Sequence, residues 1–126
     1  MSTGVGVWVE AARPRTLPAA VVPVASGTAA ALALGTPVAW GRAVLALIVA
    51  LALQVAVNFA NDLFDGLGGI DTEDRVGPRR VVAAGLVTPT RMKVGLAVAL
   101  TVAAAAGLTL AALTSWWLLA VGAVAI

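Results

Sequence analysis

Long apolar runs alternate with short polar segments along the chain. The runs cover about residues 17–35, 43–64 and 94–113, and a helix that crosses a bilayer needs about 20 predominantly apolar residues. A fourth run, residues 116–126, is long enough for only about half a bilayer. The pattern predicts an all-α, polytopic transmembrane helical bundle with three full spans and a truncated fourth. We expect residues 1–16 to include a short interfacial helix.

Composition excludes most other classes of protein. Of 126 residues, 61% are hydrophobic and 11% are charged, whereas a soluble domain is about 45–50% apolar and about 25% charged. Mean hydropathy is +1.02, so neither a soluble domain nor a disordered chain fits. The chain has no cysteine and no histidine. This excludes disulfide scaffolds, histidine zinc sites and Ser-His-Asp triads.

The cations are unevenly placed between the apolar runs. Arg13 and Arg15 precede the first run, five more cations lie within residues 75–93, and only Arg42 separates the first two runs. Positive charge favours the cytoplasmic side of a membrane. We therefore expect a multi-pass protein of the cell (inner) membrane, with its N-terminus and residues 65–93 in the cytoplasm. A net charge of +2 is too small to indicate nucleic-acid binding.

The second apolar run carries a polar stripe. At about 100° per residue, five side chains fall within an arc of about 100°: Gln54, Asn58, Asn61, Asp62 and Asp65. A polar stripe on a membrane helix must face protein or water, because lipid cannot satisfy it.

The end of this stripe is a candidate site for a divalent cation and a diphosphate. Asp62 and Asp65 share one helix face, and their repulsion is relieved by a divalent cation such as Mg²⁺, which prefers oxygen ligands. The arginines at positions 75, 79 and 80 can bind a diphosphate bidentately. The pattern alone leaves a blander possibility open, in which Gln54 and Asn58 only join helices and the charged residues form a solvated loop.

The charged region also resembles a known motif. It reads Asn61-Asp62-Leu63-Phe64-Asp65, then Gly69-Ile70-Asp71-Thr72 and Arg75-Val76-Gly77-Pro78-Arg79-Arg80. This resembles the first aspartate-rich motif of intramembrane aromatic prenyltransferases, the UbiA superfamily. The general motif has its last Asp where this chain has Gly69, and the next acid is Asp71. That departure, together with the opening Ala12-Arg13-Pro14-Arg15-Thr16-Leu17-Pro18, is most similar to the branch that prenylates 1,4-dihydroxy-2-naphthoate in menaquinone biosynthesis.

The resemblance implies a role for each matching residue. Asp62 and Asp65 would be the Mg²⁺ ligands, and Asp71 the third acid of the catalytic set. The diphosphate of the substrate would be held by Asn58, Asn61, Arg75, Arg80 and Arg13. The implied reaction is Mg²⁺-dependent transfer of a polyprenyl group from polyprenyl diphosphate to the aromatic acid, with loss of carbon dioxide.

The family also has about nine spans and a second aspartate-rich motif in its C-terminal half. This chain has no acid after Asp74. We therefore expect residues 1–126 to form the N-terminal part of a single prenyltransferase domain and to be inactive alone.

Four other functions are alternatives to naphthoate prenylation. Another aromatic acceptor is possible within the same superfamily. A CDP-alcohol phosphotransferase also has an Asp-x-x-Asp-Gly motif, which residues 62–66 fit, but its following Ala-Arg is Ile70-Asp71 here. A small four-span transporter would carry an acid deep in its first span, and residues 17–35 have none. A purely structural hairpin does not explain why acids and arginines converge. The sequence does not indicate an oligomeric state or a prenyl length.

Overall fold

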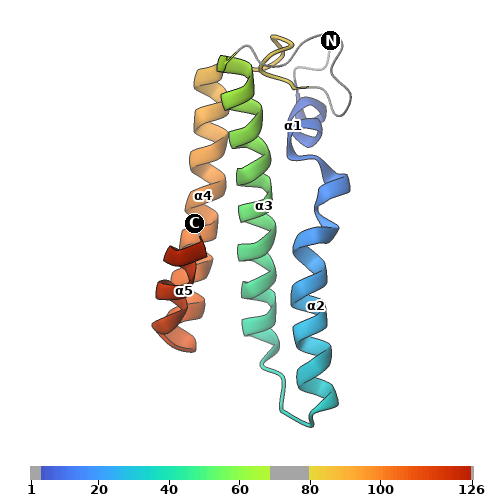
Figure 1. Ribbon diagram of the computed structural model, residues 1–126, viewed down its shortest axis with the longest axis vertical. Helices are drawn as coiled ribbons and strands as arrows, with labels where there is room; N and C mark the ends of the chain where they lie inside the picture. Colours follow the sequence, from blue (N-terminus) through green and yellow to red (C-terminus); the bar gives the residue numbers. More distant parts are fainter. Residues whose placement is uncertain (1–3, 69–79, 126) are drawn as a thin grey trace.

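The computed structural model describes residues 4–68 and 80–125, and in these ranges every regular element is a helix. Figure 1 shows the helices running roughly side by side. In chain order they are α1 (Val5–Ala12), the short 3-10 helix η1 (Pro14–Thr16), α2 (Pro18–Ala33), α3 (Trp40–Gly68), α4 (Pro89–Leu113) and α5 (Trp117–Ala125). The predicted all-α class is confirmed.

Two helices, α3 and α4, are each long and apolar enough to cross a membrane. Their 29 and 25 residues give about 44 and 38 Å of helix at 1.5 Å per residue. Both exceed the predicted runs in length. Helix α4 begins at Pro89 because Thr88 caps it, accepting a hydrogen bond from the Arg91 N–H at 3.2 Å, and proline suits a first helical position.

The first predicted span, residues 17–35, corresponds to a single helix, α2, which is preceded by a shorter helical segment. Helix α2 has 16 residues, or about 24 Å, which is short for a bilayer. Residues 5–16 precede it at an angle of 50°, and the two pieces together have the length and composition of a span. Within the first piece, α1 ends at Arg13, whose φ of 54° lies in the left-handed region, and η1 follows. The expected short helix before the first span is therefore α1.

Helix α3 lies in the middle of the molecule, with α4 on one side and α2 on the other (Figure 1). Buried alanines line its contact with α4, among them Ala56, Ala99 and Ala103. Small residues let membrane helices approach closely. Many large apolar side chains on the outer faces stay exposed, such as Val98 and Leu108. Such a surface suits lipid and not water. The nine-residue α5 contacts α4.

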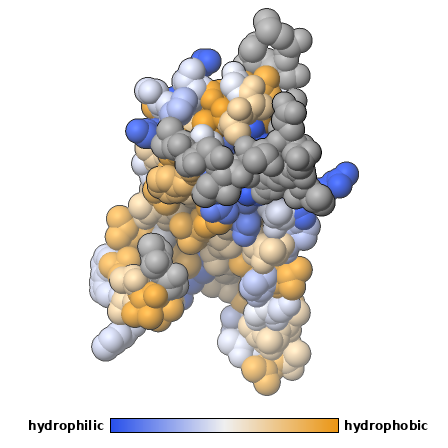
Figure 2. Space-filling view, turned by 45° about the horizontal axis from the view of Figure 1, so that its top comes forward, coloured by the Kyte–Doolittle hydropathy of each residue, from blue (hydrophilic) through white to orange (hydrophobic). Residues whose placement is uncertain are grey.

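A compact core forms at the end where α3 stops and α4 starts. Its buried side chains come from four segments: Val7, Ala11, Phe59, Leu63, Val81, Val82, Val87 and Met92. The Trp8 ring packs edge-on against Phe59, with centroids 5.5 Å apart. Figure 2 shows hydrophilic residues gathered towards this end and hydrophobic residues along the helical stems. The charged end of the bundle is therefore the well-packed one.

Candidate functional site

Asp62 points into the protein from the last turns of α3. Its side chain is fully buried, at 0% exposure. Oδ2 accepts a hydrogen bond from the Val81 N–H at 3.0 Å, and Oδ1 accepts one from the Val82 N–H at 2.8 Å. Both oxygens of this predicted metal ligand thus bind the backbone that leads into α4.

The segment held by Asp62 is a single helical turn. The Gly85 N–H donates to the Val82 carbonyl at 3.0 Å, and the Leu86 N–H donates to the Val81 carbonyl at 2.9 Å. This pair of bonds is the Schellman pattern that ends helices, and Gly85 supplies the positive φ of 75° that it requires. The first N–H groups of such a turn have no partner within it. Asp62 caps them from a distant part of the sequence.

Asp65 lies one turn further along α3 and has a different partner. The Arg80 Nη2 is 2.8 Å from the Asp65 Oδ2. The Arg80 side chain is 9% exposed and that of Asp65 is 29% exposed, so the pair sits at the edge of the packed core. The structure brings together a predicted metal ligand and a predicted diphosphate-binding arginine.

Asn58 joins α3 to the N-terminal segment. Its Nδ2 donates to the Ala12 carbonyl at 2.8 Å and to the Thr16 Oγ1 at 2.9 Å. The Thr16 hydroxyl in turn donates to the Arg13 carbonyl at 2.8 Å. Asn58 is 3% exposed, so this predicted diphosphate residue fixes the bend between α1 and α2.

Arg13 carries the strained backbone of that bend and a half-buried side chain. Its Nε and Nη2 atoms are buried and find no hydrogen-bond partner in the described part of the chain. A buried donor without a partner costs about 1–3 kcal/mol. The guanidinium is therefore suited to an anion that approaches from outside the described residues. Asn61 is exposed on α3.

Three predicted residues, Asp71, Arg75 and Arg79, lie in 69–79, outside the described residues. Within residues 4–68 and 80–125, no three acidic side chains gather into a metal-binding group. The described part of the site is therefore one acid–arginine pair, one buried acid, two asparagines and Arg13.

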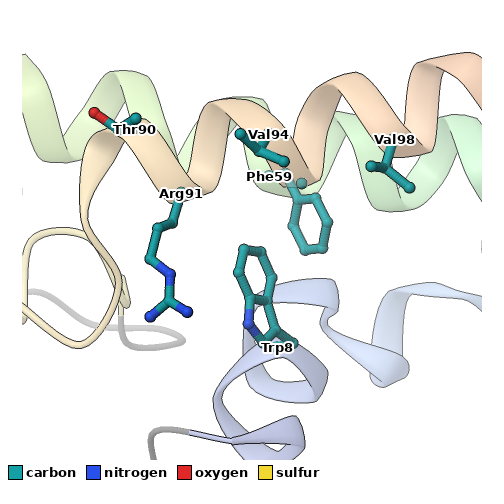
Figure 3. Close-up of a pocket in the computed structure, with 7 residues that line it drawn as sticks. Trp8, Phe59, Thr90, Arg91, Val94 and Val98 are labelled. Carbon is teal, nitrogen blue, oxygen red and sulfur yellow. The ribbon is translucent and has the colours of Figure 1, made fainter.

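An apolar groove runs beside this end of the bundle. A cavity of about 560 Å³ is lined by Trp8, Phe59, Thr90, Arg91, Val94, Gly95 and Val98, and Figure 3 shows the Arg91 side chain next to the Trp8 ring. A second cavity of about 400 Å³ shares Phe59, Gly95 and Val98 and continues along α3 and α4. At about 100° per residue, Phe59 and Asp65 lie about 120° apart around α3. The groove and the ion pair therefore occupy different faces of this helix.

Sequence reasoning missed the backbone donors and the glycine that lets them approach. A Cβ on Gly66 would lie 2.6 Å from the Val82 Cγ1. Backbone N–H groups leave no mark in a sequence, because almost every residue carries one. The glycine directly after Asp65 was the available signal, since glycine permits a close backbone approach.

The arrangement is that of a helical membrane protein with an acid–arginine site at the end of a span. Residues 20–126 match the UbiA prenyltransferase family, and the chain belongs to this family.

Its curated relatives carry a more specific name. A protein of Mycobacterium tuberculosis named 1,4-dihydroxy-2-naphthoate octaprenyltransferase is 51% identical over 119 residues, which cover 94% of this chain and 40% of the relative. Proteins of the same name from Mycobacterium leprae and Escherichia coli are 49% and 38% identical, over 94% and 83% of this chain and 40% and 34% of their own lengths. The chain thus spans about two fifths of the length of the two mycobacterial relatives and about one third of that from Escherichia coli. No solved structure matches it.

Proposed function

We propose that this chain forms part of a prenyltransferase that transfers a polyprenyl group from polyprenyl diphosphate to 1,4-dihydroxy-2-naphthoate. The observation that carries the proposal is the pairing of Arg80 with Asp65 at 2.8 Å, at the charged end of a membrane-length helix. The name of relatives up to 51% identical supports the acceptor, and the two helices of membrane length support the membrane setting. Another aromatic acceptor is the alternative within the family.

The donor groups at this end suit Mg²⁺. Asp65 is partly exposed and Asn61 is exposed. Both offer the oxygen ligands that Mg²⁺ prefers, and Mg²⁺ usually completes its shell with water and substrate phosphate. We propose Asp65 as a ligand with Asn61 beside it and with the predicted acid Asp71. Bound there, Mg²⁺ would stabilise the negative charge on the departing diphosphate.

The chain's own cations would hold the diphosphate. Arg80 can keep one guanidinium nitrogen on Asp65 and turn others towards phosphate oxygens, since the fork carries five donors. Arg13 presents buried Nε and Nη2 atoms, and Asn58 fixes the bend on which Arg13 stands. Arg75 belongs to the same proposal from its place in the motif.

Prenyl transfer then follows from charge and shielding. The allylic C–O bond breaks and its electron pair leaves with the diphosphate. The electron-rich ring carbon bonds to the allylic carbon, and the ring loses its carboxylate as carbon dioxide. Fixed cations stabilise the leaving group, and the apolar helices exclude water from the cation. We place this chemistry at the cytoplasmic face of the cell membrane, where the arginines cluster.

A chimera tests the proposal. This chain replaces the matched 119 residues of the M. tuberculosis relative, and membranes containing the chimera receive radiolabelled octaprenyl diphosphate with 1,4-dihydroxy-2-naphthoate. We expect a prenylated, decarboxylated product. Arg80→Gln should lower its rate strongly, whereas Arg42→Gln, at the other end of α3, should not. A chimera that stays inactive while the unmodified relative works, or equal rates for the two variants, would count against the proposal.

A further inference from the structure

We propose that Asp62 is a positioning residue that places Arg80 through the backbone, and that it is not a metal ligand. The proposal rests on the proposed function, because it takes Arg80 to bind the diphosphate. It replaces the role of Mg²⁺ ligand that the motif resemblance implies for Asp62. It follows from three features of the described residues: the partners of the carboxylate, the space above Gly66, and the position of Arg80 in the turn.

The Asp62 carboxylate caps the turn with both of its oxygens. Two consecutive amides, of Val81 and Val82, donate to its two different oxygens at 3.0 and 2.8 Å. A carboxylate that accepts N–H bonds at the start of a helical turn satisfies donors that the turn cannot satisfy itself. The side chain is fully buried, whereas a ligand of a metal shared with substrate must reach the cavity that the substrate enters. Asp65, at 29% exposure, meets that requirement.

Gly66 supports the same assignment independently. Its missing side chain leaves room for the turn, because a Cβ there would lie 2.6 Å from the Val82 Cγ1 and 3.2 Å from the Ala83 backbone nitrogen. Val81 and Val82 are themselves buried in the core. Because Gly66 has no side chain, the segment that Asp62 caps can pack directly against α3.

The turn begins at Arg80, which makes it the link between Asp62 and the site. The Ala84 N–H donates to the Arg80 carbonyl at 2.9 Å, so Arg80 is the first residue of the capped turn. Holding the next two amides fixes where its side chain starts. From there the Nη2 atom reaches Asp65 at 2.8 Å. One acid thus holds the backbone and the next holds the guanidinium.

Amide exchange in the metal-free protein tests the cap directly. The ¹⁵N-labelled 126-residue chain in detergent micelles is compared with Asp62→Asn, Asp62→Ala and Gly66→Ala by nuclear magnetic resonance. We expect exchange at Val81 and Val82 to accelerate about tenfold or more in Asp62→Ala, and less in Asp62→Asn, which keeps one acceptor. Gly66→Ala should accelerate it with the carboxylate intact. Amides within α4, such as that of Leu100, should be unchanged in all three.

Asp65→Asn is the matched control, because it removes an acid from the same helix without touching the cap. It should leave Val81 and Val82 protected while shifting the Arg80 Nε–H resonance. The same resonance should shift in Asp62→Asn, while the α4 amides of that variant stay protected. If Asp62 served only the overall stability of the fold, the Arg80 resonance would not shift without a loss of protection in α4. Unchanged exchange at Val81 and Val82 in Asp62→Ala, or acceleration across all helices alike, would overturn the proposal.

Mn²⁺ binding, followed by electron paramagnetic resonance, separates this proposal from the proposed function. We expect Asp62→Asn to keep the affinity of the unmodified chain within about twofold and Asp65→Asn to lose about tenfold or more, since the affinity of an oxygen-ligand site depends on the number of charged ligands. A loss in Asp62→Asn as large as in Asp65→Asn would make Asp62 a ligand and overturn the proposal. No Mn²⁺ binding by the unmodified chain would count against the metal site of the proposed function, while amide exchange still decides the role of Asp62.

Discussion

At the scale of single residues, two aspartates three positions apart have opposite environments. Asp62 is fully buried and accepts two backbone N–H bonds, whereas Asp65 is partly exposed and pairs with Arg80. Their helix positions differ by about 60° in rotation, which is enough to turn one towards the core and the other towards its edge. Two aspartates of the same motif therefore need not have the same role.

Replacement of Asp65 should remove activity in the chimera with the M. tuberculosis relative. We expect Asp65→Ala to lower the rate of prenyl transfer at least about 10²-fold, the usual cost of losing an electrostatic contact in the transition state. Asp62→Ala should also lower it strongly, by displacing Arg80. Glu73→Ala, at an acid to which the motif resemblance gives no role, should cost far less. The measurement is product formation per mole of enzyme at saturating substrate.

Removal of divalent cations with a chelator tests the same metal site. Activity should vanish with EDTA and return on addition of Mg²⁺, because a bound divalent cation is in equilibrium with chelators. An enzyme indifferent to EDTA, or one in which Asp65→Ala and Glu73→Ala retain equal activity, would contradict the metal–diphosphate proposal.

At the scale of elements, the first helix is held to the rest of the bundle by a small set of contacts. Asn58 binds the α1–η1 junction through two hydrogen bonds. The Trp8 ring packs on Phe59 (Figure 3) and lies over Gly95, where a Cβ would be 2.6 Å from the Trp8 Cζ3. The glycine on α4 is thus required by an aromatic side chain on α1.

Gly95→Ala should therefore loosen α1. The added methyl group cannot coexist with the Trp8 ring in its present position, and overpacking of this kind costs about 1–3 kcal/mol. In a background that keeps Trp8 and replaces the other three tryptophans with phenylalanine, Trp8 emission should change and become easier to quench with iodide.

Gly107→Ala on the same helix is the control. A Cβ there would meet only the Val49 Cγ2, at an ordinary 3.8 Å, and alanine favours the helix. Its Trp8 emission should match that of the parent. Identical emission from both variants would show that Trp8 does not lie against α4.

The elements also show what the sequence can and cannot predict. The apolar runs predicted α3 and α4 because length and hydropathy decide a membrane helix. The polar stripe correctly placed Asn58, Asp62 and Asp65 on neighbouring positions of one helix. The sequence did not indicate their partners: Asn58 bonds η1, whereas Asp62 and Asp65 both contact the segment that begins at Arg80. Both segments are distant from these α3 residues in sequence, and their approach depends on packing and on glycines.

At the scale of the whole molecule, charge is concentrated at one end of an apolar bundle. Arg13, Arg80 and the start of α4 lie at the end where Asp62 and Asp65 are buried or paired. The opposite end has Arg42 near the start of α3. This asymmetry gives the bundle a polar end for a charged headgroup and a long apolar body for a hydrocarbon tail.

The 126-residue chain by itself should not transfer prenyl groups. It spans 40% of the M. tuberculosis relative and carries no acid after Asp74, so the second aspartate-rich cluster of the family has no counterpart in it. Purified chain incubated with octaprenyl diphosphate, the naphthoate and Mg²⁺ should give no product above a protein-free control. Turnover would mean that copies of the chain complete the site between them.

The charge asymmetry also predicts the orientation of the bundle. Of the six cations in the described residues, five flank the end that includes residues 80–88 and Arg42 lies near the other, so the first end should face the cytoplasm. The chain has no cysteine, which allows single-cysteine variants without further changes. Ala84→Cys and Thr36→Cys place an exposed thiol at each end. In intact bacterial cells an impermeant maleimide should label Thr36→Cys and not Ala84→Cys, and permeabilised cells should label both. Labelling of Ala84→Cys alone in intact cells would reverse the orientation, and it would place the acid–arginine site on the side away from cytoplasmic substrates.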